Sequence, residues 1–112
     1  MKNSIVLVPF PFDDFSEVKL RPALCLTNEI GVYQQIVIAF ISSKLESNVL
    51  ASDFIIESKL KTETGLKVDS VIKLHKMVTV PKSIIKRKLG ELDPKDSKII
   101  QQKIVQLFEL NI

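Results

Sequence analysis

The chain has 112 residues, of which 46% are hydrophobic and 26% charged, and this composition excludes a disordered protein and predicts one soluble globular domain over residues 1–112. No apolar run is long enough to cross a bilayer, so we expect a cytoplasmic protein that makes no contact with a membrane. The formal net charge is +3, and a single cysteine with a single histidine excludes an internal disulfide and an ordinary zinc site, so we expect neither a metal nor another cofactor.

The charge is distributed unevenly along the chain. Residues 1–56 carry four basic and six acidic side chains, whereas residues 57–112 carry twelve and seven. A basic half can bind a polyanion, although scattered solvated lysines explain the same pattern.

The first part of the chain predicts three strands, over residues 5–8, 23–27 and 35–41. The first is a continuous apolar run that suits a strand buried on both faces, and Pro9 and Pro11 should end it because proline donates no hydrogen bond to a sheet. A polar loop over residues 12–19 follows it. The third run is almost wholly apolar and should be a central strand, after which Ser42 and Ser43 emerge at the surface.

Three further strands are predicted over residues 53–57, 70–80 and 84–92, with a helical turn stopped by Gly65 between the first two. Along residues 70–80, strict alternation places His75 on one face of the strand and Lys76 on the other. The face that carries Lys76 is otherwise apolar. This lysine must therefore reach water or an anion, because an unpaired ammonium is costly to bury.

The last predicted element is a helix of about 16 residues. Asp93 is a good N-cap, and Pro94 suits the first helical position because its missing N–H costs nothing there. An apolar stripe recurs on one side, and we expect it to lie against the sheet. It comprises Ile100, Ile104, Leu107 and Phe108, widened by Ile99, Val105 and Leu110. Five to seven short strands with one terminal helix predict a mainly β (β-rich α+β) fold, a small SH3-like, partly open barrel.

Arg21 stands directly before Pro22 at the start of the second predicted strand. Proline restricts the residue before it to an extended conformation, so Arg21 should be a cation fixed at the mouth of the strand. Taken alone, Arg21 is better explained as a solvated surface arginine, and Ser42 as a hydroxyl that caps a turn.

Six blocks of the sequence resemble, in order and spacing, the MazF/PemK toxins of type II toxin–antitoxin systems. They cover residues 5–12, 21–24, 39–43, 68–72, 78–82 and 90–92. The resemblance implies a compact SH3-like barrel with a C-terminal helix that forms a homodimer in the bacterial cytoplasm. It also implies metal-independent, sequence-specific cleavage of single-stranded RNA, and neutralisation by a cognate antitoxin whose disordered tail lies in the RNA groove.

The catalytic pair of that family carries over to Arg21 and Ser42. A guanidinium offers planar, paired donors to a phosphoryl group, so Arg21 would stabilise the charge that builds up when a ribose 2′-hydroxyl attacks the phosphate, and would donate a proton. Ser42 would position the same phosphate by hydrogen bonding. We expect four further residues to bind RNA, namely Lys19, Ser43, Lys44 and Lys76.

The sequence departs from the family pattern in the long strand, where Lys76 replaces a glutamine and Val78 replaces a basic residue. These changes leave a second class of function open, a weakened toxin that serves as a binding module for an antitoxin, RNA or another protein. A gyrase-directed toxin ranks last, because residues 106–112 lack the aromatic ending that such an activity implies. His75 has the imidazole of a general base, but it should face away from Lys76.

Overall fold

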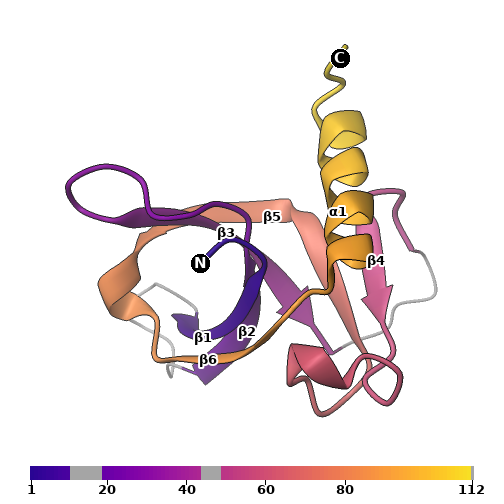
Figure 1. Cartoon of the computed structure of the whole chain (residues 1–112), viewed down its shortest axis with the longest axis horizontal. Helices are drawn as coiled ribbons and strands as arrows, with labels where there is room; N and C mark the ends of the chain where they lie inside the picture. Colours follow the sequence, from indigo (N-terminus) through magenta and orange to yellow (C-terminus); the bar gives the residue numbers. More distant parts are fainter. Residues whose placement is uncertain (11–18, 44–48, 112) are drawn as a thin grey trace.

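The computed structural model describes residues 1–10, 19–43 and 49–111. Within them, six strands form one antiparallel sheet in the order β4-β5-β3-β2-β1-β6 (Figure 1). The sheet curls into a half-barrel, and α1 stands beside β4 and β5. This confirms the predicted mainly β, SH3-like, partly open barrel with a C-terminal helix. The elements are β1 (Ser4–Phe10), β2 (Lys19–Cys25), β3 (Gln35–Ser42), β4 (Asp53–Ile56), β5 (Ser70–Pro81), β6 (Arg87–Glu91), α1 (Pro94–Leu107) and the 3-10 turns η1 (Thr62–Thr64) and η2 (Lys82–Ile84).

The first two strands are longer than the sequence predicts, because Pro9 lies inside β1 and Pro22 inside β2. The prediction that Pro9 ends the first strand is therefore wrong, and Pro11 lies outside the described residues. Pro9 is paired with Leu20, and Pro22 lies in β2 opposite Leu7. A proline is tolerated where one side of a strand has no partner. The side of β1 next to β6 is paired only as far as Leu7, and β3 pairs with β2 only from Ala23 onward. Arg21 is therefore the third residue of β2 and not a residue at its mouth.

Both faces of the sheet carry a hydrophobic core, which explains why the runs in β1 and β3 are apolar without alternation. One core lies under α1 and includes Ile5, Leu24, Ile41, Ile72, Leu74 and Ile100. The other lies inside the curl of the sheet and includes Val6, Val8, Ala23, Cys25, Ile36, Ile38 and Val80. Successive residues of a strand thus enter different cores, and few positions remain for polar side chains.

A large bulge interrupts β5 where it pairs with β3. Ala39 is paired with Met77, but the next residue, Phe40, is paired with Lys73. Residues 74–76 therefore have no partner on β3. A bulge of this kind bends the strand and redirects its side chains. The strict alternation predicted along residues 70–80 is therefore wrong in the middle of the strand.

The helix α1 begins as predicted and ends earlier. Asp93 caps it, because its Oδ1 accepts a hydrogen bond of 2.7 Å from the Asp96 amide. Ile100 is buried in the core under α1, and Ile104 and Leu107 pack against that core, which confirms this part of the expected stripe. Its last members, Phe108 and Leu110, are exposed, so the stripe is shorter than predicted. The helix has 14 residues and leaves Phe108 exposed after its last turn. Among the described residues, no helix has the length and apolar character required to cross a membrane.

The turn η1 packs closely on β6 at two glycines. A Cβ on Gly90 would lie 2.2 Å from the Glu63 carbonyl oxygen, and a Cβ on Gly65 would lie 2.1 Å from the Leu89 carbonyl oxygen. Gly65 also has a φ of +73°, which confirms its predicted role in ending the turn.

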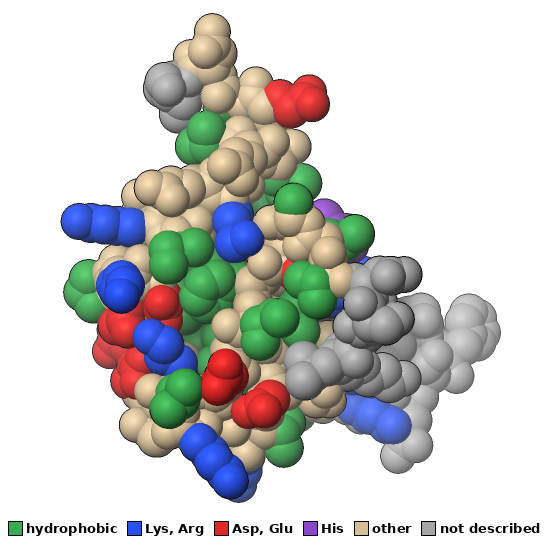
Figure 2. Space-filling view, turned by 90° about the vertical axis from the view of Figure 1, so that its right-hand side faces the viewer, with side chains coloured by type: hydrophobic (Ala, Val, Ile, Leu, Met, Phe, Trp, Pro, Cys, Tyr) green, Lys and Arg blue, Asp and Glu red, His purple; other side chains and the backbone are tan. Residues whose placement is uncertain are grey.

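Figure 2 shows the face of the molecule that carries α1, with hydrophobic side chains gathered at its centre and acidic and basic side chains around them.

Candidate active site

Four strands contribute to a cavity of about 300 Å³ in which three of the predicted site residues, Arg21, Ser42 and Lys76, meet. Arg21 enters it from β2 and Ser42 from the end of β3. We call this the first cavity. Its lining is Phe10, Arg21, Phe40, Ile41, Ser42, Lys73, Lys76, Met77 and Val78. The walls are therefore largely apolar and aromatic, and the polar groups are three cations and one hydroxyl.

Arg21 is held against an aromatic pair. Pro22 keeps the backbone of Arg21 extended, and the guanidinium carbon lies 5.6 Å from the centroid of the Phe10 ring. The Phe10 and Phe40 rings are 4.7 Å apart between centroids and tilted by 56°. A cation over an aromatic face is attracted by the ring quadrupole, so the exposed Arg21 side chain has a preferred position beside the cavity.

Lys73 is the buried cation of the first cavity, and its side chain is only 10% exposed. Its Nζ donates a hydrogen bond of 3.0 Å to Asp53 Oδ2 across the β4–β5 pair. The same oxygen accepts a hydrogen bond of 3.0 Å from the Leu50 amide. Burial raises the pKa of the Asp53 carboxyl, but the hydrogen bonds from Leu50 and Lys73 outweigh it, so the pKa lies below its ordinary value. Asp53 is therefore a carboxylate that fixes Lys73 in place.

The bulge in β5 brings Lys76 to the same cavity as Lys73. Strict alternation separates two residues three apart onto opposite faces, and the unpaired residues 74–76 remove that separation. Lys76 is exposed, so the expectation that it reaches water is confirmed. His75 lines a different depression, beside Lys103 and Leu107 near α1, and lies on a different side from Lys76 as expected.

A second cavity of about 380 Å³ adjoins the first, because Arg21 and Ile41 line both. Ser43 lines the second cavity, whereas Ser42 lines the first, so consecutive hydroxyls at the end of β3 serve different cavities. Lys67 and Arg87 add further positive charge to the second cavity. Of the other predicted RNA-binding residues, Lys19 is exposed opposite Phe10 and lines neither cavity. Lys44, like most of the predicted loop at 12–19, lies outside the described residues.

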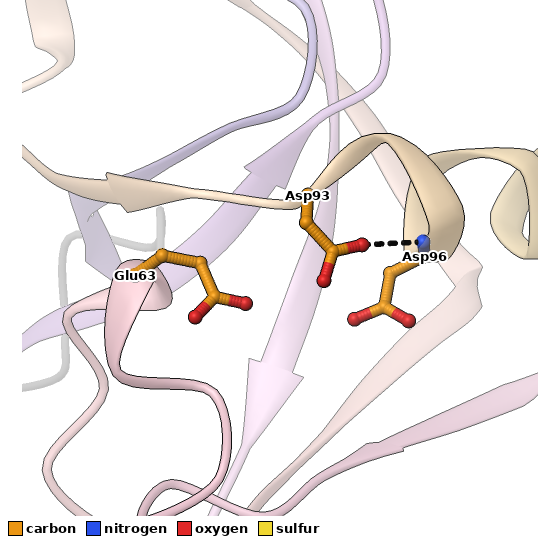
Figure 3. Close-up of side chains that lie close together, drawn as sticks. All are labelled: Glu63, Asp93 and Asp96. Carbon is orange, nitrogen blue, oxygen red and sulfur yellow. Dashed lines mark hydrogen bonds between the residues drawn. The ribbon is translucent and has the colours of Figure 1, made fainter.

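Three carboxylates, Glu63, Asp93 and Asp96, point toward one another near the start of α1 (Figure 3), with ligand atoms within 4.8 Å. Such a cluster is the kind of site that holds a metal ion. Here the Lys61 ammonium supplies the positive charge, because its Nζ lies 3.2 Å from Asp93 Oδ2 and 3.1 Å from Asp96 Oδ2. Hydrogen bonds to Asp96 and Asp93 raise the pKa of Lys61, so this cluster ties η1 to α1 by an ion pair.

Cys25 is not a nucleophile of the site. It is fully buried in the core inside the curl, and burial raises its pKa to about 11. The thiol therefore stays protonated at neutral pH and packs as a small hydrophobic residue, as the apolar run around it predicts.

The comparison with known proteins identifies the chain. Residues 1–108 match the family described as PemK-like, MazF-like toxin of type II toxin-antitoxin system. The chain belongs to this family. The sequence resemblance to MazF/PemK toxins is thus confirmed over nearly the whole length. The chain has no close match among curated protein sequences.

Solved structures of toxins share the fold of this PemK-like chain. A Mycobacterium tuberculosis toxin, MazF-mt6, superposes with a TM-score of 0.75 at 21% identity, over 97% of this chain and 99% of that one. An endoribonuclease in complex with its cognate antitoxin from Mycobacterial species gives 0.74 at 11% identity, over 100% and 97%. A crystal structure of an Mtb toxin gives 0.63 at 22% identity, over 77% and 90%. The barrel, including β6 and α1, is therefore the fold of these toxins.

Proposed function

We propose that this PemK-like toxin is a sequence-specific endoribonuclease that cleaves single-stranded RNA without a metal ion. The observation that supports this most directly is that Arg21 and Ser42, far apart in sequence, line one cavity with the cations Lys73 and Lys76. Membership of a family of type II toxins supports the same activity, and one solved structure with this fold is an endoribonuclease.

The proposed reaction is attack of a ribose 2′-hydroxyl on the adjacent phosphorus. A P–O bond to the 2′-oxygen forms, the bond to the 5′-oxygen of the next nucleotide breaks, and the proton lost by the 2′-hydroxyl is balanced by the one gained by the leaving oxygen. Arg21 would stabilise the charge on the phosphoryl oxygens with paired donors, which is the largest contribution that a fixed cation can make. Ser42 would hold the same phosphate by a hydrogen bond. The chain itself supplies positive charge, so a metal is not required for this role.

The two cavities suit a single strand of RNA better than a duplex. Single-stranded RNA is recognised through unstacked bases that lie against aromatic side chains, and Phe10 and Phe40 offer such a surface in the first cavity. The exposed cations Arg21 and Lys76 are placed to bind phosphates at its rim. Ser43, Lys67 and Arg87 line the second cavity and would bind the part of the RNA strand that extends into it.

We further propose that the toxin acts as a homodimer in the cytoplasm and is neutralised by an antitoxin protein. The solved complex of a similar fold contains a cognate antitoxin, and exposed apolar side chains such as Leu20 and Val68 adjoin the second cavity. Light scattering at tens of micromolar should give twice the mass of the chain, since a standard-size interface holds at such concentrations. A monomer under these conditions would contradict the dimer.

The test of the nuclease is cleavage of single-stranded RNA oligonucleotides by the purified chain in the presence of EDTA. We expect fragments with a new 5′-hydroxyl at short, defined sequence motifs. Ser42→Ala should slow cleavage roughly tenfold, the effect of one lost hydrogen bond to a charged group. The matched control is Ser83→Ala, an exposed serine of η2 that lines neither cavity, which should cleave at the wild-type rate. An enzyme inactive on all RNAs, or one inactivated by EDTA, would exclude this mechanism and favour the binding-module alternative.

A further inference from the structure

Lys73 has hydrogen-bonding capacity that the described residues do not use. A lysine ammonium has three donors, and lysines are almost never buried unless they are paired. Among the described residues, Asp53 accepts one of these hydrogen bonds, and the ammonium lies in the wall of the first cavity with its side chain 10% exposed. As far as the described residues go, the remaining donors have only the cavity to face, where water or a ligand with acceptor atoms can satisfy them.

The surroundings of Lys73 favour an uncharged acceptor over a phosphate. Asp53 lies 3.0 Å away, so the pair has no net charge, and its Oδ1 is buried without a hydrogen-bond partner in the described part of the chain. A phosphate placed here would meet that carboxylate and would lose its hydration in an apolar cavity. Arg21 and Lys76 are exposed at the rim and have no ion pair with a described residue, so they are the better phosphate ligands.

The walls near Lys73 suit the flat face of a nucleobase. Phe40 is the residue opposite Lys73 in the β3–β5 pair, its ring packs on Phe10, and Met77 and Val78 complete the apolar lining. Bases of single-stranded RNA bind by stacking on such side chains while their edges form hydrogen bonds. The Lys73 ammonium, at the edge of this surface, can donate a hydrogen bond to the edge of a base stacked there.

We infer that Lys73, positioned by Asp53, recognises one RNA base in the first cavity, and that this base carries an exocyclic keto oxygen, guanine or uracil. A lysine only donates, so it matches the exocyclic oxygen of guanine (O6) or uracil (O4), whereas adenine and cytosine present an amino group at the corresponding position. This inference rests on the proposed function, because it names the base preference of the same cavity. Lys73 would set specificity, while Arg21 and Ser42 act on the phosphate.

The inference is tested by binding, so that it can be separated from cleavage. For each position of the recognised motif, four RNAs are made that differ only in the base at that position. Each RNA carries a 2′-deoxy sugar at the cleaved nucleotide, so that it binds without being cleaved. The affinity of the intact protein for each RNA is measured by titration. Wild type should bind guanine or uracil at one position at least roughly tenfold more tightly than adenine and cytosine. Lys73→Met should bring this ratio close to one and leave the slope of log affinity against log salt unchanged, because no phosphate contact is lost.

Three further variants are measured beside Lys73→Met. Lys73→Met leaves Asp53 buried and unpaired, which can unfold the protein, so the double variant Asp53→Asn with Lys73→Met is measured beside it. Lys76→Gln should show the opposite pattern, with an unchanged base ratio and a salt slope smaller by about 0.7 for one contact to a single strand. Lys61→Met removes an ion-paired lysine remote from the first cavity and should change neither.

Three outcomes would overturn the inference: a wild-type protein that prefers adenine or cytosine or has no base preference, folded Lys73 variants that keep the wild-type ratio, or Lys73 variants whose salt slope falls while the ratio persists. The last result would show a phosphate contact. If wild type cleaves RNA and one of these occurs, only the inference fails. If wild type binds with the expected ratio and cleaves nothing, the inference stands and the proposed nuclease fails.

Discussion

The Arg21 guanidinium lies over the Phe10 ring, 5.6 Å from its centroid, at the place where the two cavities adjoin. An exposed arginine normally samples many rotamers, and fixing it when a substrate binds costs conformational entropy. Contact with the ring and the extended backbone before Pro22 reduces this cost before substrate arrives. Phe10 therefore has two roles in the proposed site, as an apolar wall and as a support for the cation.

Two variants of Arg21 should separate the effect of its positive charge from the effect of the planar shape of the guanidinium. Arg21→Ala should lower cleavage of single-stranded RNA by roughly a hundredfold or more, because the transition state loses its main cation. Arg21→Lys should recover little of this, since an ammonium cannot make the paired, planar contact. Single-turnover cleavage rates with excess enzyme provide the measurement. Wild-type rates in Arg21→Ala would remove Arg21 from the chemistry.

Phe10→Leu tests the support of Arg21 by the ring. Leucine keeps an apolar wall but has no π-face, so we expect affinity for a non-cleavable RNA to fall about three- to tenfold. If part of this loss of affinity acts through Arg21, Phe10→Leu should weaken RNA binding less in an Arg21→Ala background than in wild type. A double-mutant cycle measures this difference. Strictly additive effects of the two substitutions would show that Phe10 acts only as a wall or stacking surface.

The stability of the fold should depend on pH in the acid range. In Asp93, a hydrogen bond from the Asp96 amide and the ion pair with Lys61 lower the pKa, and the pKa of Asp53 is also lowered. Each group binds protons more weakly in the folded than in the unfolded state. Its stabilisation is therefore complete above the unfolded pKa of about 4 and is lost as the pH falls through the folded pKa. The midpoint of thermal unfolding should be constant from about pH 7 to 5 and should fall below about pH 4.

Asp93→Asn provides a control for this dependence. Asparagine is also a good N-cap, so helix capping is preserved while the titrating group is removed. Below about pH 4 the variant should lose less stability per pH unit than wild type. Equal acid slopes for the two proteins would show that Asp93 contributes nothing to acid unfolding.

The close packing of η1 on β6 predicts that Gly90→Ala destabilises the protein by about 1–3 kcal/mol, the usual range for overpacking, because the Cβ would overlap the backbone of Glu63 and Thr64. Gly31→Ala is the matched control, since its Cβ would meet nothing within 4 Å and only its φ of +71° is unfavourable. We expect about 1 kcal/mol there. Chemical denaturation gives both values, and a smaller effect at Gly90 than at Gly31 would contradict the packing.

Most of the fold could be predicted because its signals are local. Apolar runs bounded by turn residues indicated the strands, and Asp93 with Pro94 marked the start of α1. The lengths of β1 and β2 could not be predicted in the same way. Whether a strand tolerates Pro9 or Pro22 depends on which of its sides is paired at that residue, and this is decided by β6 and β3, which are distant in sequence.

The candidate site was predicted only in part, for a related reason. Arg21 and Ser42 were found through the family resemblance, and Lys76 through its place in an apolar strand. Lys73 was missed because alternation placed it away from Lys76, and a bulge is visible only when the partner strand is known. Its signal was a lysine within the apolar run of β5 together with an aspartate at the start of β4, a pair 20 residues apart.

The pairing of β1 with β6 has a consequence for the order of folding. Ser4 is paired with Glu91 and Ile5 with Gly90, so two segments far apart in the sequence lie side by side at this edge. Such non-local contacts slow folding, because a long loop must close before they form. This side of β1 has no strand partner until β6 has been synthesised. The half-barrel therefore closes at this edge only once β6 is available to pair with β1.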